Sequence, residues 1–217
     1  MMQGKKYNTV IWDLDGTLLD TLEDLKDSVN FAMREYGYAE RTLEEIRVFV
    51  GNGVKKLVEL AIPGGSDNPK YPEVYDVFCK HYEKHNMDKT RPYAGVVEVI
   101  SKLKDRGVKQ AIVSNKVDSG VQTLNNAFFG VDVAIGVQEG LVRKPAPDMV
   151  FKALEELEAD KNLTVYVGDS EVDLKTAESS GLDCISVLWG FRKREELEPF
   201  SPKCMISNPE DVLNFIK

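Results

Sequence analysis

The sequence has few of the residues from which disulfide-bonded, zinc-binding or membrane proteins are built. Its 217 residues include only three cysteines, Cys79, Cys184 and Cys204, which are far apart and form no CxxC pair. This pattern predicts neither a disulfide framework nor a zinc site, and it favours a reduced, cytoplasmic setting. No apolar run is long enough to cross a bilayer, and residues 1–9 are too polar for a signal peptide. We therefore expect no membrane association.

Positive charge is also in short supply. The chain carries 28 Lys and Arg against 36 Asp and Glu, a net charge of −8. This balance argues against general attraction to nucleic acid, although a local group of cations can still bind an anionic substrate. Hydrophobic residues make up 42% of the chain and charged residues 29%, as in a globular protein with a sizeable core. The expected partner is a small molecule, bound by a monomer or a homodimer.

Short apolar runs alternate with segments of helical periodicity over most of the chain. Apolar runs without strict polar alternation are typical of strands that are covered on both faces. Strand, helix and strand in succession predict an α/β fold with a doubly wound parallel sheet. The expected strands are residues 9–12, 109–113, 131–136, 164–167, 184–188 and 205–206, and the expected helices are residues 96–106, 120–128, 147–157 and 172–180.

One region between the first two strands breaks this rhythm. It shows no convincing strand and has helical patterns at residues 21–36, 43–49, 54–61 and 71–85. An all-helical block in this position predicts an inserted subdomain. We therefore expect an α/β core from residues 1–19 and 86–217 and a helical cap from residues 20–85, with the second crossing near residues 86–92.

Acidic and polar side chains follow several of the predicted strands. Ligands of an open parallel sheet bind beyond the carboxyl ends of its strands, so these side chains should converge on one edge. They are Asp13 and Asp15 after the first strand, Ser114 and Asn115 after the second, Lys144 at the start of a helix, and Asp169 and Asp173 after the fourth strand.

Carboxylates that crowd together repel one another and oppose folding unless a cation is present. Mg²⁺ prefers hard oxygen ligands and leaves positions for water or phosphate oxygens. One Mg²⁺ and Lys144 would balance three ionised carboxylates, and Ser114 with loop N–H groups could hold a phosphate. The pattern therefore predicts magnesium-dependent phosphoryl transfer.

These residues resemble the four motifs of the haloacid dehalogenase superfamily. The motifs are DLDGTL at residues 13–18, a serine after the second strand, a downstream lysine, and GDxxxD at residues 168–173, and their order and spacing agree over residues 8–190. The helical insertion after the first motif resembles the branch with a small α-helical cap. The resemblance extends to phosphoglycolate phosphatases and their relatives through residues 50–54, 91–96, 114–116 and 189–192.

The resemblance implies catalytic and metal-binding roles. Asp13 would attack phosphorus and form a phosphoaspartate, while Lys144 neutralises charge beside it. Asp15 would protonate the leaving oxygen and then take a proton from the attacking water. Mg²⁺ would be held by the Asp13 carboxylate, the Asp15 backbone carbonyl and Asp169, with Asp173 as a further ligand or as a neighbour of the ligands.

The resemblance also implies substrate contacts. The phosphoryl group would be held by Gly16 and Thr17 of the first motif and by Ser114 and Asn115. In the cap, a helix begins after Gly51 and Asn52 and carries Lys55 and Lys56, and a helix N-terminus with flexible backbone can bind an anion. We predict that Lys55 or Lys56 meets a carboxylate or second anionic group of the substrate. Solvated lysines on a simple loop are the alternative.

A structural role is an alternative to a functional one for several residues. Ser114 could be a helix N-cap, and Asp173 could be an acid that stabilises a helix N-terminus. Trp189 could lie in a loop near the site or pack in the core. His81 and His85 have a spacing that can bind metal, but the glutamate of the metalloprotease pattern is missing, so a solvated helix face is favoured.

The predicted activity is that of a Mg²⁺-dependent phosphatase for a small phosphorylated metabolite, with 2-phosphoglycolate as the first choice. The superfamily's dehalogenases and phosphonatases lack an aspartate at the position of Asp15, so its presence favours a phosphoester. A β-phosphoglucomutase-like isomerase, an inorganic pyrophosphatase and a non-enzymatic phospho-acceptor module remain as alternatives.

Overall fold

The computed structural model describes residues 6–217 and divides the chain into two compact units. One unit combines the N-terminal segment to Leu19 with Pro92–Lys217, and the other is Asp20–Arg91. The helical unit extends past residue 85 because the chain after its last helix is hydrogen-bonded to Asp24. The Asp24 carboxylate accepts hydrogen bonds from the Lys89 N–H at 3.0 Å and the Thr90 N–H at 2.9 Å. Residues 1–5, part of the stretch that we expect not to be a leader, lie outside the described residues.

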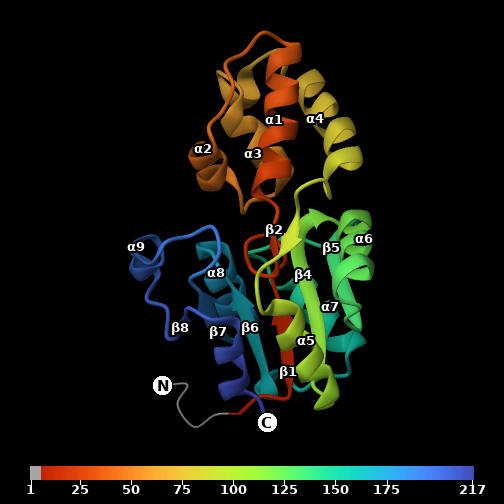
Figure 1. Ribbon diagram of the computed structural model, residues 1–217, viewed down its shortest axis with the longest axis vertical. Coiled ribbons are helices and arrows are strands. Elements are labelled where there is room, and N and C mark those ends of the chain that lie inside the picture. The colour runs from red at the N-terminus through yellow and green to blue at the C-terminus, as the bar shows by residue number, and fades with distance from the viewer. Residues whose placement is uncertain (1–5) are drawn as a thin grey trace. The chain divides into compact units, whose positions relative to one another are not determined.

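The larger unit contains the expected doubly wound parallel sheet (Figure 1). Within residues 6–217 its strand order is β5-β4-β1-β6-β7-β8, and all neighbouring strands are parallel. From β1 the chain moves outward to β5 and then crosses back to β6, so the strand order reverses between β1 and β6. The strands are β1 (Thr9–Trp12), β4 (Lys109–Val117), β5 (Val133–Val137), β6 (Thr164–Gly168), β7 (Asp183–Val187) and β8 (Met205–Ile206).

Helices cover both faces of this sheet. Because side chains alternate across a strand, Val10 and Trp12 of β1 face one core while Ile11 faces the other. The first core is closed by α5 (Val96–Asp105), α6 (Asp118–Phe128) and the 3₁₀ helix η4 (Pro209–Phe215), and the second by α7 (Asp148–Glu156) and α8 (Glu171–Ser180). The remaining short helices of this unit are α9 (Arg194–Leu197), η2 (Lys161–Leu163) and η3 (Glu198–Phe200).

The second predicted strand is longer than the sequence indicated. β4 continues to Val117, and its register with β5 shifts between Val113 and Val117. Ser114 therefore lies within the irregular end of the strand rather than after it. It is not a helix N-cap either, because the N-cap of α6 is Val117.

The smaller unit is helical, as the periodicity predicts. Its helices are α1 (Leu22–Glu35), α2 (Leu43–Phe49), α3 (Gly53–Ala61), η1 (Gly65–Asp67) and α4 (Tyr71–His85). The two crossings between the units contain two short strands that the sequence did not reveal, β2 (Leu19–Asp20) and β3 (Arg91–Pro92), which pair with each other. No helix within residues 6–217 is long and apolar enough to span a membrane.

Candidate active site

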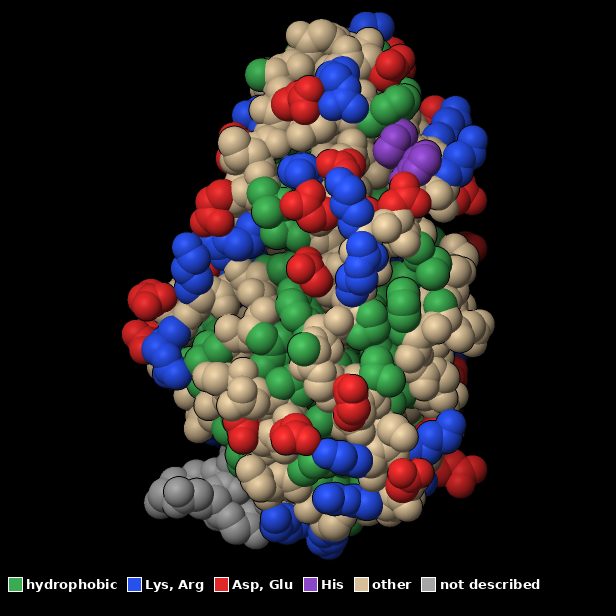
Figure 2. Space-filling view, viewed as in Figure 1, with side chains coloured by type: hydrophobic (Ala, Val, Ile, Leu, Met, Phe, Trp, Pro, Cys, Tyr) green, Lys and Arg blue, Asp and Glu red, His purple; other side chains and the backbone are tan. Residues whose placement is uncertain are grey.

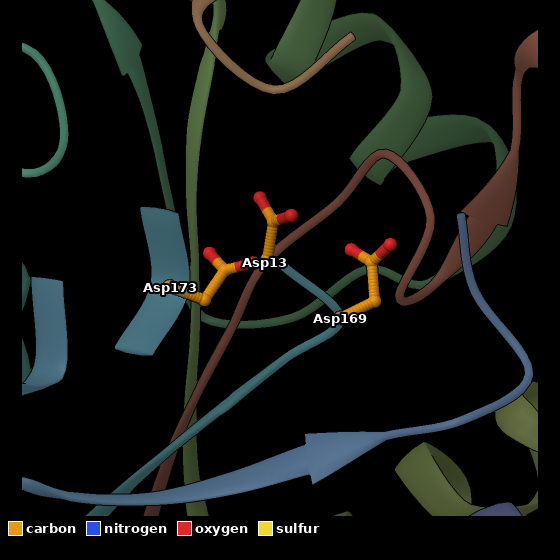
Figure 3. Close-up of side chains that lie close together, drawn as sticks. All are labelled: Asp13, Asp169 and Asp173. Carbon is orange, nitrogen blue, oxygen red and sulfur yellow. The ribbon is translucent and has the colours of Figure 1, made fainter. Parts of the chain in front are cut away.

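Three of the predicted metal ligands lie together at the carboxyl edge of the sheet. Asp13 follows β1, Asp169 follows β6, and Asp173 belongs to the first turn of α8, so the group straddles the point where the strand order reverses. One carboxylate oxygen from each lies within 4.8 Å of the others. Figure 3 shows the three side chains lying close together. Their exposed fractions are only 7%, 1% and 1%.

Lys144 is buried against this cluster. Its Nζ lies 2.6 Å from Asp13 Oδ1 and 2.8 Å from Asp173 Oδ1, and it donates to the Tyr166 hydroxyl at 3.0 Å. Burial alone would lower the pKa of Lys144, but the carboxylates of Asp13 and Asp173 outweigh it and raise that pKa well above its usual value. Lys144 is therefore a charged part of the cluster.

The Asp173 carboxylate is engaged by donors from the chain on both of its oxygens. Oδ2 accepts hydrogen bonds from the Ser170 N–H at 3.0 Å and the Ser170 hydroxyl at 2.6 Å. Oδ1 contacts Lys144 and accepts from the Tyr166 hydroxyl at 3.2 Å. This geometry favours a role for Asp173 in orienting Lys144 over a role as a direct metal ligand.

The Asp169 carboxylate is held in place by two loops. Oδ2 accepts a hydrogen bond from the Phe191 N–H at 2.7 Å, and Oδ1 accepts from the Thr17 hydroxyl at 3.3 Å. Trp189 joins these loops, because its indole Nε1 donates to the Thr17 carbonyl at 3.0 Å. Trp189 therefore lies in a loop near the site, as one of the two alternatives predicted. It also packs, partly buried, against the core.

Two glycines allow this close packing. Gly16 has φ +89°, and a Cβ there would lie 2.5 Å from Asp169 Oδ2. At Gly190 a Cβ would overlap the Gly16 carbonyl oxygen and the Asp169 Cβ. The first motif, Asp169 and the loop after β7 can therefore meet only because neither position carries a side chain.

The cluster fits a divalent cation. Burial and the neighbouring Asp173 carboxylate raise the pKa of Asp169 to about 7, although the Phe191 N–H and Arg192 oppose this. Burial and Asp173 also raise the pKa of Asp13 well above its usual range, despite Lys144. Both shifts show that burial, and after it the neighbouring carboxylate, disfavour the ionised form when no further cation is present. Hard, buried carboxylate oxygens are the donors that suit Mg²⁺.

Asp15 is separate from the three-carboxylate cluster. Its Oδ1 pairs with Lys116 Nζ at 3.1 Å, and its Oδ2 lies 3.5 Å from Ser114 Oγ. Any metal ligand from Asp15 would therefore be its backbone carbonyl. Asn115 lies beside this pair and donates through Nδ2 to the Lys144 carbonyl at 3.1 Å.

The predicted cap residues lie in the helical unit, at the start of α3 or just before it. Gly51 and Asn52 precede α3, and Lys55 is exposed on its first turn. Lys56 is paired with Glu59, with 2.6 Å between Nζ and Oε1. A substrate contact by Gly51, Asn52 or Lys55 stays a prediction.

The two histidines do not form a purely solvated helix face, because both rings contact other side chains. Their rings stack on one another with centroids 4.3 Å apart, and His81 also stacks on Phe31. The two histidine side chains form the purple patch in Figure 2. His81 Nδ1 lies 3.0 Å from Ser28 Oγ, and His85 Nδ1 lies 2.8 Å from Asp88 Oδ2. The contacts of His81 with Ser28 and Phe31 hold α4 against α1.

Comparison with known proteins agrees with this geometry. The sequence model of haloacid dehalogenase-like hydrolases matches residues 10–187. The chain belongs to this family. It is 35% identical over 191 residues to a phosphoglycolate phosphatase of Cereibacter sphaeroides, covering 84% of this chain and 86% of the relative. A phosphoglycolate phosphatase of Mesorhizobium japonicum is 31% identical over 206 residues, with coverage of 92% and 90%.

A solved structure from Lactobacillus delbrueckii, whose assignment as phosphoglycolate phosphatase is itself a prediction, is 34% identical with a TM-score of 0.89 and coverage of 95% and 97%. As a haloacid dehalogenase-like hydrolase with these relatives, the chain is an enzyme of the phosphatase class.

Four site residues were not among those predicted. Tyr166 contacts Lys144, the Phe191 N–H binds Asp169, and Lys116 pairs with Asp15. Arg192 donates from Nε to Glu171 Oε2 at 3.0 Å and thereby joins the loop after β7 to the start of α8. Lys116, Phe191 and Arg192 lie in the segments that resemble the phosphoglycolate phosphatases, and this was the only signal for them.

Proposed function

We propose that the chain hydrolyses 2-phosphoglycolate in a Mg²⁺-dependent reaction. The observation that carries this proposal is the buried cluster of Asp13, Asp169 and Asp173 with Lys144 against it. The substrate is suggested by the two relatives, both of which are phosphoglycolate phosphatases. A cytoplasmic location fits the three free cysteines.

Asp13 is the nucleophile in this proposal. Its carboxylate would attack phosphorus and form an acyl phosphate while the ester oxygen leaves. Lys144, 2.6 Å from Asp13 Oδ1, orients the nucleophile and offsets negative charge as the phosphoryl group approaches. Asp173 and Tyr166 hold the Lys144 ammonium in that position.

Asp15 serves as the acid and base. It would donate a proton to the departing alkoxide and later take one from the water that cleaves the acyl phosphate. Ser114 and Asn115, which lie between Asp15 and Lys144, would donate hydrogen bonds to the phosphoryl oxygens. Gly16 and Thr17 of the first motif would adjoin the phosphoryl group, although the Gly16 N–H donates to the Leu19 carbonyl at 2.8 Å and the Thr17 N–H to the Leu14 carbonyl at 3.3 Å.

Asp13, Asp169 and the Asp15 carbonyl would hold Mg²⁺, with Asp173 beside them. The ion, when bound, supplies positive charge that offsets the charge of the phosphoryl oxygens. The Phe191 N–H and the Thr17 hydroxyl fix the Asp169 carboxylate for this task. The helical unit would act as a lid that excludes water and selects the leaving group through Gly51, Asn52 and Lys55.

A panel of phosphorylated metabolites, assayed for phosphate release with Mg²⁺ and with EDTA, tests the proposal. We expect 2-phosphoglycolate to give the highest kcat/KM and EDTA to abolish turnover. Asp13→Asn keeps the size of the side chain but removes its charge, so we expect a loss of at least roughly a thousandfold in kcat.

Asp160→Asn is the matched control. Asp160 lies before β6, at the opposite end of that strand from Asp169, and asparagine can still accept the hydrogen bond that Oδ1 takes from the Asn162 N–H. It should retain full activity. Isomer formation from a sugar phosphate without phosphate release, or a clear preference for pyrophosphate, would replace the proposed substrate.

A further inference from the structure

The site contains two buried lysines, and each pairs with a different aspartate of the first motif. Lys144 pairs with Asp13 and Lys116 with Asp15, and their side chains are only 3% and 5% exposed. Burying an ammonium group is costly unless it is paired with a negative charge and hydrogen-bonded. The proposed reaction accounts for Lys144 but assigns nothing to Lys116.

The chain holds Lys116 firmly in this place. Its N–H donates to Ser114 Oγ at 3.1 Å, within the irregular end of β4. The aliphatic part of its side chain passes over Gly120 in α6, where an added Cβ would lie 3.3 Å from Lys116 Cδ. These contacts direct the ammonium group toward Asp15.

We propose that Lys116 determines substrate specificity by binding an anionic group next to the leaving oxygen, namely the carboxylate of 2-phosphoglycolate. The inference rests on the proposed function, in which Asp15 contacts the leaving oxygen at hydrogen-bond distance. Lys116 Nζ lies 3.1 Å from the same Asp15 carboxylate. The carboxylate carbon of 2-phosphoglycolate is two bonds from the leaving oxygen, so its oxygens can reach this ammonium group.

The distribution of charge supports this assignment. 2-Phosphoglycolate is negative at both ends, with a phosphate at one end and a carboxylate at the other. Lys144 lies on the side of the nucleophile, where it contacts Asp13 and Asp173. Lys116 lies on the side of the leaving group, where it contacts Asp15. Each end of the substrate would therefore meet its own buried cation, and phosphoesters with a neutral leaving group would use only one of the two.

The test compares two substrates that differ in the carboxylate, 2-phosphoglycolate and 2-hydroxyethyl phosphate. The readout is the ratio of their kcat/KM values, because any effect of Lys116 on Asp15 changes both substrates alike. We expect Lys116→Met to lower this ratio by roughly 10- to 100-fold, the value of a charged hydrogen bond, mainly through KM for 2-phosphoglycolate. Lys116→Arg keeps the charge and should retain most of the preference.

Two further variants serve as a control and as a second, independent perturbation of Lys116. Lys109→Met removes a lysine from the other end of β4, where Nζ donates to the carbonyls of Leu157 and Glu158, and should leave the ratio unchanged. Gly120→Ala presses on the Lys116 side chain and should lower the ratio in the same direction, which decides the question if Lys116→Met does not fold. A wild-type preference for 2-phosphoglycolate that Lys116→Met and Gly120→Ala leave intact overturns the role of Lys116 alone. A wild-type enzyme without that preference overturns the proposed function as well.

Discussion

At the scale of single residues, the position of Asp169 depends on two neighbouring glycines that carry no side chain. The Asp169 carboxylate is packed against Gly16 and Gly190, and a methyl group at Gly190 would overlap both Asp169 and the Gly16 carbonyl. Because those neighbours are backbone and a short side chain, they cannot move aside cheaply.

We therefore predict that Gly190→Ala weakens Mg²⁺ binding by at least roughly tenfold, since the metal-ligand geometry is displaced. Isothermal titration calorimetry with Mg²⁺ measures this effect directly. Gly107→Ala is the control, because Gly107 has φ +70° with open space around its Cβ position. That control strains the backbone without touching the site and should leave Mg²⁺ affinity unchanged, so equal affinities in all three proteins would contradict the prediction.

At the scale of elements, the junction of β6 and α8 performs two tasks at once. Ser170 stands before the first residue of α8, and its N–H and hydroxyl both bind Asp173 Oδ2. The other Asp173 oxygen contacts Lys144. The start of the helix and the orientation of the active-site lysine are thus coupled through one carboxylate.

Ser170→Ala should accordingly lower both stability and catalysis. We expect a loss of about 1 kcal/mol in the free energy of unfolding, typical of an N-cap, together with a fall in kcat. Thr42→Ala removes the corresponding N-cap of α2, where Thr42 and Glu45 form a capping box. It should cost a similar free energy of unfolding but leave kcat unchanged. Urea unfolding and steady-state kinetics of the two variants, measured side by side, separate the two effects, and an unaltered kcat in Ser170→Ala would argue against the coupling.

Local sequence patterns predicted the helices and strands whose hydrophobic pattern is regular. The expected bounds of β1, β8, α2 and α4 agree with the structure, because each is a short apolar run or a periodic segment with clear ends. The end of β4 could not be predicted, since Ser114, Asn115 and Lys116 are polar and continue the strand only by pairing irregularly with β5. The sequence also did not predict the pairing of β2 with β3 or of Lys116 with Asp15, because both pairs join residues that are far apart in the chain.

The positions of the motif aspartates were easier to predict than the groups that hydrogen-bond to the site residues. Asp13 and Asp169 follow predicted parallel strands, so topology alone brings them to one edge. Nothing in the local sequence shows that the Phe191 N–H binds Asp169 or that Tyr166 binds Lys144.

At the scale of the whole molecule, the buried acids make stability depend on pH and on metal. The pKa of Asp169 is about 7 in the folded protein, because the group is buried beside Asp173, against an ordinary value of 3.8. A carboxyl with a raised pKa favours folding below pH 3.8, and this contribution is lost as the pH rises through about 7. Since one pKa unit is worth about 1.4 kcal/mol, this group accounts for a loss on the order of 4 kcal/mol in the metal-free protein.

We predict that Mg²⁺ restores this loss, so that it raises Tm more at about pH 8 than at about pH 5.5. Thermal unfolding with Mg²⁺ and with EDTA at the two pH values provides the measurement. Asp169→Asn removes the titrating group and should raise the Tm of the metal-free protein at the higher pH, while nearly abolishing the response to Mg²⁺. The same gain in Tm at both pH values would show that the acids do not govern it.

The pairing of β2 with β3 also has an evolutionary consequence. The points where the helical unit leaves and rejoins the α/β unit lie on adjacent, hydrogen-bonded strands, so the insertion begins and ends at almost the same place. A segment of any length or fold can be exchanged there without stretching the sheet or changing its strand order. New leaving-group preferences can then arise by replacing that segment, while the chemistry at Asp13 is inherited unchanged.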